Sequence, residues 1–545
     1  MQETLRQKDK GSTIISHIDA DCVLPKRNPF LFYKGGTMLK TITEINNVIN
    51  DFVWVKIGLI LLIGTGILMT IMTKVFQVTH IGHWFKETIG SVFKKDSAAT
   101  KKTDKKSISQ FQALCTALAA TIGTGNIAGV AAAIVIGGPG AVFWMWVAAF
   151  LGMMTNYSEN LLGIYYRRKN KDGEWSGGPM YYLKDGLGRK KGMKYVGGIL
   201  AVLFSIFAIL ASFGIGNMGQ VNKITLNIDS AFLKGVNLGA VAGIPITHII
   251  IGGVLMIVAA LIIIGGLQRI AAVAEKVVPF MAVLYVIGAL IVFVINIENV
   301  GAMFLSIFRF AFGVKAVGGA AIGIAIKEVI TQGCKRGVFS NEAGLGSSVI
   351  VHSSSNVKEP VTQGLWGIFE VFFDTFVVCT MTAIVVLSSG YINLETGIAN
   401  PGVDDATLVS QVFGQHFGIV GEMFIALAML LFAFTTVLGW SQYGTKAVEY
   451  LFGEKAVKVY KVIFVLMIMS GAVMTSSLAW DISDTFNGLM MVPNLIGVVA
   501  LSPMVVKITR NYVNRRINKI DEAPILSYDA EIQKEAEEAI KTEEP

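Results

Sequence analysis

The sequence of 545 residues predicts an all-α integral membrane protein with eleven transmembrane helices. The chain is 53% apolar and 15% charged, whereas an average soluble protein is about 25% charged. Apolar runs of about 20 residues, the length that crosses a bilayer, recur along it. Lys and Arg gather in the short segments between these runs. These three observations exclude a soluble enzyme, a disordered protein and a disulfide scaffold. They also exclude a nucleic-acid-binding protein, because the net charge of +8 is spread over loops.

Ten runs are apolar and have no interior charge cluster. They cover about residues 53–73, 112–136, 141–165, 196–220, 247–266, 277–296, 364–388, 419–439, 459–478 and 485–506. An eleventh candidate, residues 303–331, is less regular, because it holds Arg309 and Lys315 and is interrupted by several glycines.

The distribution of basic residues decides whether this eleventh segment spans. With eleven spans, and with the loop 74–110 in the cytoplasm, the cytoplasmic segments hold 34 Lys and Arg and the outer loops hold only Lys223 and Lys234. With ten spans, the basic loop 441–461 and the C-terminal tail would lie outside. Because cytoplasmic loops carry the excess of positive charge, we expect 303–331 to span. The C-terminus is then cytoplasmic and the N-terminus outside.

Residues 1–37 are polar and lack the continuous apolar stretch of a signal peptide. The tetrapeptide Lys34-Gly35-Gly36-Thr37 directly precedes Met38. It can be encoded by AAA-GGA-GGA-ACA, a purine-rich ribosome-binding sequence. We therefore predict that Met38 is the true start, that 1–37 is a translated leader, and that the host is a bacterium. The alternative is a disordered extracellular arm.

The run 112–136 contains Gly123-Thr124-Gly125-Asn126 at its middle. Two glycines and two polar side chains at bilayer depth predict an unwound segment. The freed N–H groups of the following half-helix suit a carboxylate, and the freed carbonyls before the break suit a monovalent cation. The alternative is close helix packing through small residues.

The second predicted break lies at the middle of 303–331, where Gly318 and Gly319 are adjacent. Broken helices at the second and seventh spans fit an inverted repeat of five plus five helices, with a binding site between the breaks at the midplane. Gly318 and Gly319 are therefore expected to line the substrate site. The predicted organisation is a leader (1–37), an amphipathic segment (38–52), a peripheral transmembrane helix (53–73), a first five-helix repeat (112–296), a second five-helix repeat (303–506) and a cytoplasmic tail (507–545).

Five motifs carry a resemblance to a known family. They are GTGNIAG (Gly123–Gly129), GGPGAVFWMWVAAFLG (Gly137–Gly152), SGGPMYYL (Ser176–Leu183), FSNEAGLGSS (Phe339–Ser348) and TTVLGWSQYG (Thr435–Gly444). In order and over nearly all of 38–506, they resemble the alanine or glycine:cation symporter family. The resemblance implies a leucine-transporter-type fold and sodium- or proton-coupled uptake of small neutral amino acids. It implies that the Gly-Thr-Gly backbone, with Thr124 and Gly125, receives the substrate carboxylate. It also implies that the Thr and Trp of TTVLGW lie at the cation and substrate sites.

Thr435 and Thr436 are expected to coordinate sodium together with carbonyls from Ala119 to Ile122, just before the first break. Thr hydroxyls also commonly bond to carbonyls of their own helix, which is the alternative. Trp440, one turn after Thr436, is expected to wall the substrate pocket, or else to belong to an aromatic belt at the lipid interface.

Acidic side chains inside apolar runs are costly and are functional candidates by default. Asp374 lies near the middle of 364–388 and is a candidate ligand of a second cation, or a buried acid bonded to Thr375. Glu370 lies one turn earlier. Glu159 is expected near a loop, where it pairs with the basic segment 166–195.

Asn217 and Gln220 share one helix face at i and i+3, so we expect them at the outer side of the pocket. The FSNEAGLGSS motif is expected in a cytoplasmic loop, where Ser340 or Asn341 caps a helix. The six His show no ligand spacing, and no ATPase, serine hydrolase or metalloprotease motif is present.

The sequence therefore predicts a secondary active transporter of the bacterial plasma membrane, not an enzyme. We expect its partners to be alanine or glycine, the sodium ion as coupling ion, and membrane lipid, with no cofactor. A proton-coupled symporter, or one specific for glutamine or serine, is the alternative. A membrane-embedded enzyme would need converging catalytic groups, and a channel would need a continuous polar stripe; neither pattern is found.

Overall fold

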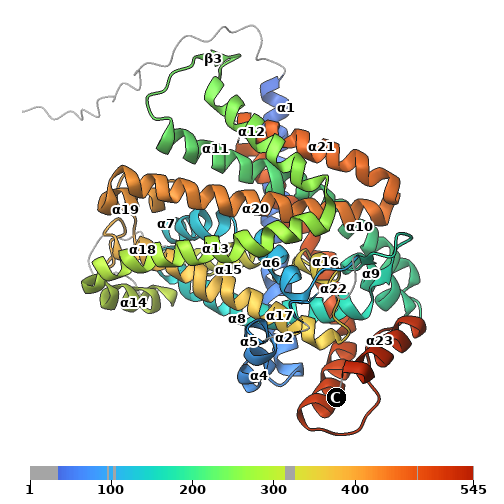
Figure 1. Cartoon of the computed structure of the whole chain (residues 1–545). Coiled ribbons are helices and arrows are strands. Elements are labelled where there is room, and N and C mark those ends of the chain that lie inside the picture. Colours follow the sequence, from blue (N-terminus) through green and yellow to red (C-terminus); the bar gives the residue numbers. More distant parts are fainter. Residues whose placement is uncertain are drawn as a thin grey trace, which may run out of the picture. The chain divides into compact units, whose positions relative to one another are not determined.

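A computed structural model describes residues 35–94, 97, 99–101, 106–312, 326–474 and 477–543 (Figure 1). The predicted leader up to residue 34, and Gly318 and Gly319, lie outside the described residues. The chain divides into two compact units, Met1–Ile45 and Asn46–Pro545. Of the first unit, the described part is the beginning of helix α1 (Gly35–Asp51). All that follows concerns the second unit.

The second unit is mostly helical. The first half holds α2 (Leu59–Met72), α3 (Phe76–Thr79), α4 (Ile81–Glu87), α5 (Ile89–Val92), α6 (Gln110–Thr121), α7 (Val130–Gly137), α8 (Gly140–Tyr165), α9 (Pro179–Tyr181), α10 (Lys194–Phe213), α11 (Gly219–Phe232), α12 (Ile246–Ile263) and α13 (Gly266–Ile295). The second half holds α14 (Ile297–Ala311), α15 (Ile326–Asn341), α16 (Ser348–His352), α17 (Pro360–Val371), α18 (Thr380–Ser388), α19 (Leu408–Phe417), α20 (Ile419–Phe452), α21 (Glu454–Val473), α22 (Ser477–Tyr512) and α23 (Ala530–Glu543). Short π-helical or 3₁₀ stretches join several of these, at Phe52–Gly58, Gly125–Gly129, Tyr182–Gly186, Leu187–Arg189, Gly214–Met218, Phe372–Cys379 and Val513–Ile517.

Within the described residues, the strands form two antiparallel hairpins in loops, an addition to the predicted all-α chain. Strand β1 (Arg168–Lys169) pairs with β2 (Trp175–Ser176), and β3 (Ala240–Val241) pairs with β4 (Ile244–Pro245).

Eight helices of the described chain are long and apolar enough to cross a membrane, and the bent pair formed by α6 and the helix Gly125–Gly137 makes a ninth. The two halves of this pair meet at an angle of 55°. Helix α8 and the pair α15–α16 do not reach the apolarity of these nine segments. The structure therefore bears out a multi-pass helical membrane protein, whereas the number eleven stays a prediction.

The helix bundle has a loop end and a tail end. The loop end carries residues 389–407 and the N-terminus of α8 at Gly140. The tail end carries the C-terminus of α8 at Tyr165 and residues 518–543. At the tail end the Tyr528 N–H donates to the Tyr165 carbonyl, and Arg515 donates two hydrogen bonds of 2.9 Å to Glu359.

Helix α14 lies along the loop end, so residues 303–311 do not cross the bundle as predicted for the span 303–331, of which 313–325 lie outside the described residues. Near its start, Asn299 donates to the Ser388 carbonyl at the end of α18 (2.9 Å). At its other end, the Trp144 indole donates to the Ala311 carbonyl (2.8 Å), and Phe310 packs against Gly140. Both ends of α14 are thus at the same end of the bundle. The sequence suggested a transmembrane span because an amphipathic helix that buries one face can contain as many apolar residues as a short span.

The segment from α15 to α16 follows α8 along its length instead. Gly333 packs against Ala141 and Gly337 against Met145 near the loop end, and Val349 packs against Gly163 near the tail end. A 26-residue helix such as α8 is about 39 Å long, so residues 326–353 traverse the bundle in the same direction as α8.

The second helix break therefore lies inside the FSNEAGLGSS motif, and its expected position in a cytoplasmic loop is wrong. Helix α15 ends at Asn341, and Glu342, Gly344 and Gly346 adopt positive φ angles of 56°, 92° and 74°. A run of left-handed residues cannot continue a right-handed helix. Helix α16 starts at Ser348, so the chain is unwound for about six residues.

The first break is where the sequence predicts it. Helix α6 begins with a capping box in which Ser109 and Gln112 satisfy each other's backbone N–H groups, and it ends at Thr121. Ile122 is extended (φ −75°, ψ 93°). The long helix α20 packs against α6 and α13 (Figure 1). Gly439 on α20 packs closely against Ala120 on α6.

Candidate functional site

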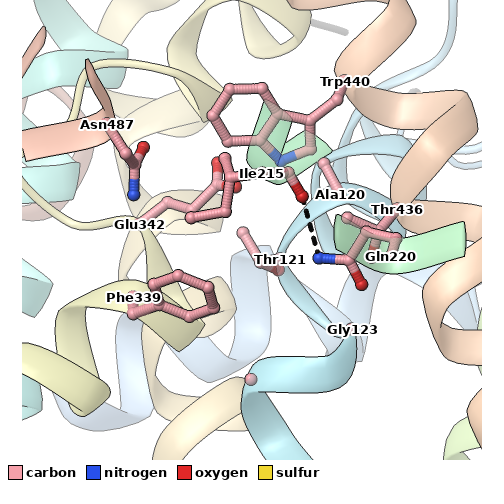
Figure 2. Close-up of a pocket in the computed structure, with 11 residues that line it drawn as sticks. Ala120, Thr121, Gly123, Ile215, Gln220, Phe339, Glu342, Thr436, Trp440 and Asn487 are labelled. Atoms are coloured by element: carbon pink, nitrogen blue, oxygen red, sulfur yellow. Dashed lines mark hydrogen bonds between the residues drawn. The ribbon is translucent and has the colours of Figure 1, made fainter. Parts of the chain in front are cut away.

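A small pocket lies where the two helix breaks meet. Its lining residues are Ala120, Thr121, Gly123, Gly125, Ile215, Gln220, Phe339, Glu342, Thr436, Trp440 and Asn487. They come from both breaks and from α10–α11, α20 and α22. Figure 2 shows Glu342 and Phe339 on one side, Gln220 and Thr436 on the other, and the Trp440 ring across the top. The cavity volume is about 10 Å³, roughly the space that one water needs. In this conformation the pocket is closed.

Side-chain amide oxygens already hold the backbone N–H groups of the first break. Gln220 Oε1 accepts the N–H of Thr124 (3.2 Å), and its Nε2 donates to the Ile215 carbonyl (3.1 Å, the dashed line in Figure 2). Asn126 Oδ1 accepts the N–H of Gly123 (2.9 Å). An amide oxygen and a carboxylate oxygen are both acceptors. Gln220 therefore occupies the acceptor position at the Thr124 N–H.

Asn126 does not line the pocket, contrary to expectation. Its Nδ2 donates to Asp374 Oδ1 (2.6 Å), and Asp374 Oδ2 accepts from Ser340 (2.8 Å) and Thr375 (2.9 Å). All four side chains are fully buried. The carboxylate of Asp374 thereby ties the first break to the last turn of α15. The sequence left open whether Asp374 is a cation ligand or a buried acid bonded to Thr375, and the bond to Thr375 is present.

Oxygen atoms gather beside the first break at the predicted cation position. The Thr436 hydroxyl lies 3.4 Å from the Ile122 carbonyl oxygen and 3.0 Å from the Phe432 carbonyl oxygen. The Thr435 hydroxyl lies 2.9 Å from the same Phe432 oxygen, 2.9 Å from the Leu431 oxygen and 3.6 Å from Met281 Sδ. Hydroxyl and carbonyl oxygens are hard donors that suit a sodium ion. Asp374 and the Ala119 carbonyl, both expected from the sequence as cation ligands, are not among the groups that these two hydroxyls contact.

The Phe432 carbonyl is a candidate ligand that the sequence analysis missed. It accepts from both threonines because hydroxyls at i and i+1 reach back to carbonyls three and four residues earlier in the same helix. That spacing is readable from the TTVLGW motif and could have pointed to it.

Glu342 is the second missed residue. It is 3% exposed, it accepts from the Ser347 hydroxyl (2.5 Å), and its carboxylate faces Trp440 in the pocket (Figure 2). In the sequence, Glu342 could have been recognised as an acid within a glycine-containing stretch. Charged neighbours such as Lys335 and Arg336 made that stretch resemble a loop.

Asn217 does not reach the pocket, because its Nδ2 donates to the Phe464 carbonyl on α21 (2.7 Å). Its neighbour Gly216 instead packs against the Trp440 ring. Of the expected substrate residues, the pocket brings together Gly125, Gln220, Thr436 and Trp440. The side chain of Thr124 faces a second cavity, described below.

The other two acids singled out in the sequence, Glu159 and Glu370, have hydrogen-bond partners on neighbouring elements. Glu159 accepts from Asn494 Nδ2 and from the Gly344 N–H. It is fully buried, so the expected pairing with the basic segment 166–195 is wrong. Glu370 accepts from Asn156 Nδ2 (2.9 Å) and lies 3.0 Å from His352 Nε2.

Comparison with known proteins identifies relatives over most of the chain. The model of the sodium:alanine symporter family matches residues 39–525. The sodium/alanine symporter AgcS of Methanococcus maripaludis is 42% identical over 480 residues, which are 88% of this chain and 98% of that protein. An uncharacterized transporter of Haemophilus influenzae is 40% identical over 89% of this chain and 100% of its own length. The probable sodium/glutamine symporter GlnT of Bacillus subtilis is 35% identical over 88% of this chain and 92% of its own length.

Among solved structures, MhsT in complex with L-phenylalanine matches 75% of this chain and 99% of its own, with a TM-score of 0.49 at 13% identity.

Proposed function

Because the chain belongs to the sodium:alanine symporter family, we propose that it couples the downhill entry of sodium to the uptake of small neutral amino acids, alanine or glycine first. Membership of this family indicates that the chain is an amino-acid symporter and not an enzyme. The observation that carries the proposal is the closed pocket between two helix breaks, with backbone N–H groups on one side and a buried carboxylate, Glu342, on the other.

A zwitterion matches this pocket at both charged ends. The substrate carboxylate replaces Gln220 Oε1 at the N–H of Thr124, at the positive N-terminus of the half-helix Gly125–Gly137. The ammonium group meets the carboxylate of Glu342. Glu342 has a hydrogen-bond donor in Ser347 but no salt-bridge partner among the described residues. A buried charge without a counter-ion is costly, so a cationic group opposite Glu342 stabilises both.

The walls favour a small side chain. Phe339, Ile215 and Trp440 close the pocket to the volume of about one water, so any substrate requires them to move, and a larger side chain requires more movement. Alanine and glycine need the least. Glutamine is the second candidate, because GlnT is a relative and because the amides of Gln220 and Asn487 could pair with a substrate amide.

Sodium is proposed to bind between Ile122, Phe432, Thr435 and Thr436. Ile122 directly precedes Gly123, so a cation on the Ile122 carbonyl fixes the backbone that presents the Thr124 N–H to the substrate. Ion and substrate would then stabilise the same arrangement of α6 and α20, which is the thermodynamic requirement for coupling. Proton coupling remains the alternative.

The proposed topology adds α8 and α15–α16 to the nine apolar spans, which gives eleven. The broken pairs are then the second and seventh spans, as an inverted repeat of five plus five helices requires. The tail end is cytoplasmic and the loop end outside, because the tail end carries most of the Lys and Arg. The proposed location is the bacterial plasma membrane.

Counterflow in proteoliposomes tests the function. Vesicles loaded with unlabelled alanine should accumulate labelled alanine when sodium is present and fail to do so in potassium. Competition by glycine, serine and glutamine ranks the substrates. Counterflow that is independent of sodium but depends on pH would identify the proton as the coupling ion. The absence of counterflow with every neutral amino acid would refute the proposal.

A further inference from the structure

A second cavity, here called the vestibule, lies on the loop-end side of the pocket. It is lined by Thr124, Gly125, Ala128, Gly129, Ala132, Lys223, Arg336, Phe339, Asp405 and Ala406. It shares Gly125 and Phe339 with the pocket, so the Phe339 side chain separates the two. The cavity volume of the vestibule is about 90 Å³, which is space for several waters.

The vestibule carries charges of both signs from three separate elements. Lys223 lies on α11, Arg336 on α15, and Asp405 on the loop before α19. No salt bridge joins any two of them in the part of the chain that the structure describes. Arg336 also lies in the field of Asp481 and Asp484, of which Asp484 is bound by Lys335 at 2.7 Å.

Two residues that line this cavity each have a buried polar atom without a protein partner. Within the described chain, neither the Nε of Arg336 nor the hydroxyl of Thr124 has a hydrogen-bond partner, although Thr124 is only 2% exposed. Because about nine in ten buried polar groups are hydrogen-bonded, two unpaired groups on residues that line one cavity favour a ligand there, toward which these side chains turn.

We propose that the vestibule is a first binding site for a free zwitterionic amino acid, occupied before the substrate passes Phe339 into the pocket. The carboxylate pairs with Arg336 and Lys223 and accepts from Thr124, and the ammonium group pairs with Asp405. A simple anion leaves Asp405 unpaired next to the bound charge, and a simple cation leaves both basic residues unpaired. Only a molecule with both charges satisfies the whole set. The identity of the amino acid rests on the proposed function.

The test measures occupancy of the vestibule directly. Ala406→Cys is labelled with a membrane-impermeant thiol reagent, and alanine is expected to slow the labelling. Protection should persist when Trp440→Ala disables the pocket and should fall at least tenfold in apparent affinity with Arg336→Gln. Lys234→Gln, an exposed cation outside the vestibule, is the matched control and should leave protection unchanged.

Two further arms separate a zwitterion site from an anion site. Asp405→Asn makes the vestibule more positive, so an anion site would bind more tightly, whereas the zwitterion site loses its ammonium partner and weakens. Propionate, which lacks the ammonium group, should protect poorly. The proposal is overturned if propionate protects as well as alanine, if Asp405→Asn strengthens protection, or if protection disappears with Trp440→Ala and survives Arg336→Gln. Uptake by the unaltered protein tests the proposed function separately, since labelling does not depend on transport.

Discussion

Asn126 Nδ2 and Asp374 Oδ1 lie 2.6 Å apart in a fully buried hydrogen bond. Asn126 belongs to the first helix break, and the other oxygen of Asp374 accepts from Ser340, two residues before the unwound part of the second break. One carboxylate thus connects the two segments on which the pocket depends. A hydrogen bond to a charged group contributes about 1.5–3 kcal/mol, so we expect the loss of this connection to destabilise the packing of the two breaks.

Replacing Asp374 by Asn should therefore reduce stability and transport without changing the dependence on sodium. The amide keeps one acceptor but introduces an unpaired donor beside Asn126 and Ser340. We expect a lower melting temperature of the purified protein and a maximal uptake rate reduced about tenfold or more. Thr375→Val removes one donor to Asp374 and the acceptor of Asn341 Nδ2, but it leaves the bonds of Asp374 to Asn126 and Ser340 in place and should cost less. A reduced Hill coefficient for sodium would instead identify Asp374 as a ligand of a second ion.

A side chain at Gly125 should block uptake. A Cβ there would lie 3.0 Å from the Phe339 ring, so Gly125→Val pushes Phe339 and crowds the N–H groups of the first break. Uptake should fall below about 1% of the unaltered rate while the protein remains in the membrane. Gly64→Val on α2, where a Cβ meets nothing within 4 Å, is the matched control. Normal transport by Gly125→Val would mean that the substrate binds elsewhere.

The two threonine hydroxyls should differ in their effect on sodium. Thr436 contacts both the Ile122 and Phe432 carbonyls, whereas Thr435 contacts only carbonyls of its own helix. Thr436→Val should raise the sodium concentration for half-maximal uptake about tenfold, which corresponds to about 1.4 kcal/mol, and Thr435→Val should raise it less. Alanine binding at saturating sodium should change little. If both variants keep the original sodium dependence, the hydroxyls only bond their own helix.

Labelling of single cysteines should separate the two positions considered for the seventh span. Cys introduced in 395–405 should label from outside, and Cys in 445–455 only after permeabilisation. Lys327→Cys, at the exposed start of α15, should label from outside, because α15 begins at the loop end. If residues 303–331 spanned instead, this position would be reached only from the cytoplasm.

The sequence by itself determined the membrane class, most spans and the first helix break. Glycines and polar residues within an apolar run are a local signal that favours a helix break. The same local reasoning found Gln220, Thr436 and Trp440, which the structure brings to one pocket.

Only the tertiary structure decided where the second break lies and which side chains face the pocket. Helix α15 carries Lys335 and Arg336, so its hydropathy is that of a loop, and it is buried only because Asp484 on α22 and neighbouring helices supply partners. Conversely, α14 is apolar but lies along one end of the bundle. Asn126 and Asn217 turned out to face Asp374 and Phe464, since π-helical turns rotate the residues around them by an amount that helical spacing does not reveal. Local sequence patterns indicate which secondary structure a segment forms. Residues distant in sequence determine where that segment lies in the bundle and which of its side chains face the pocket.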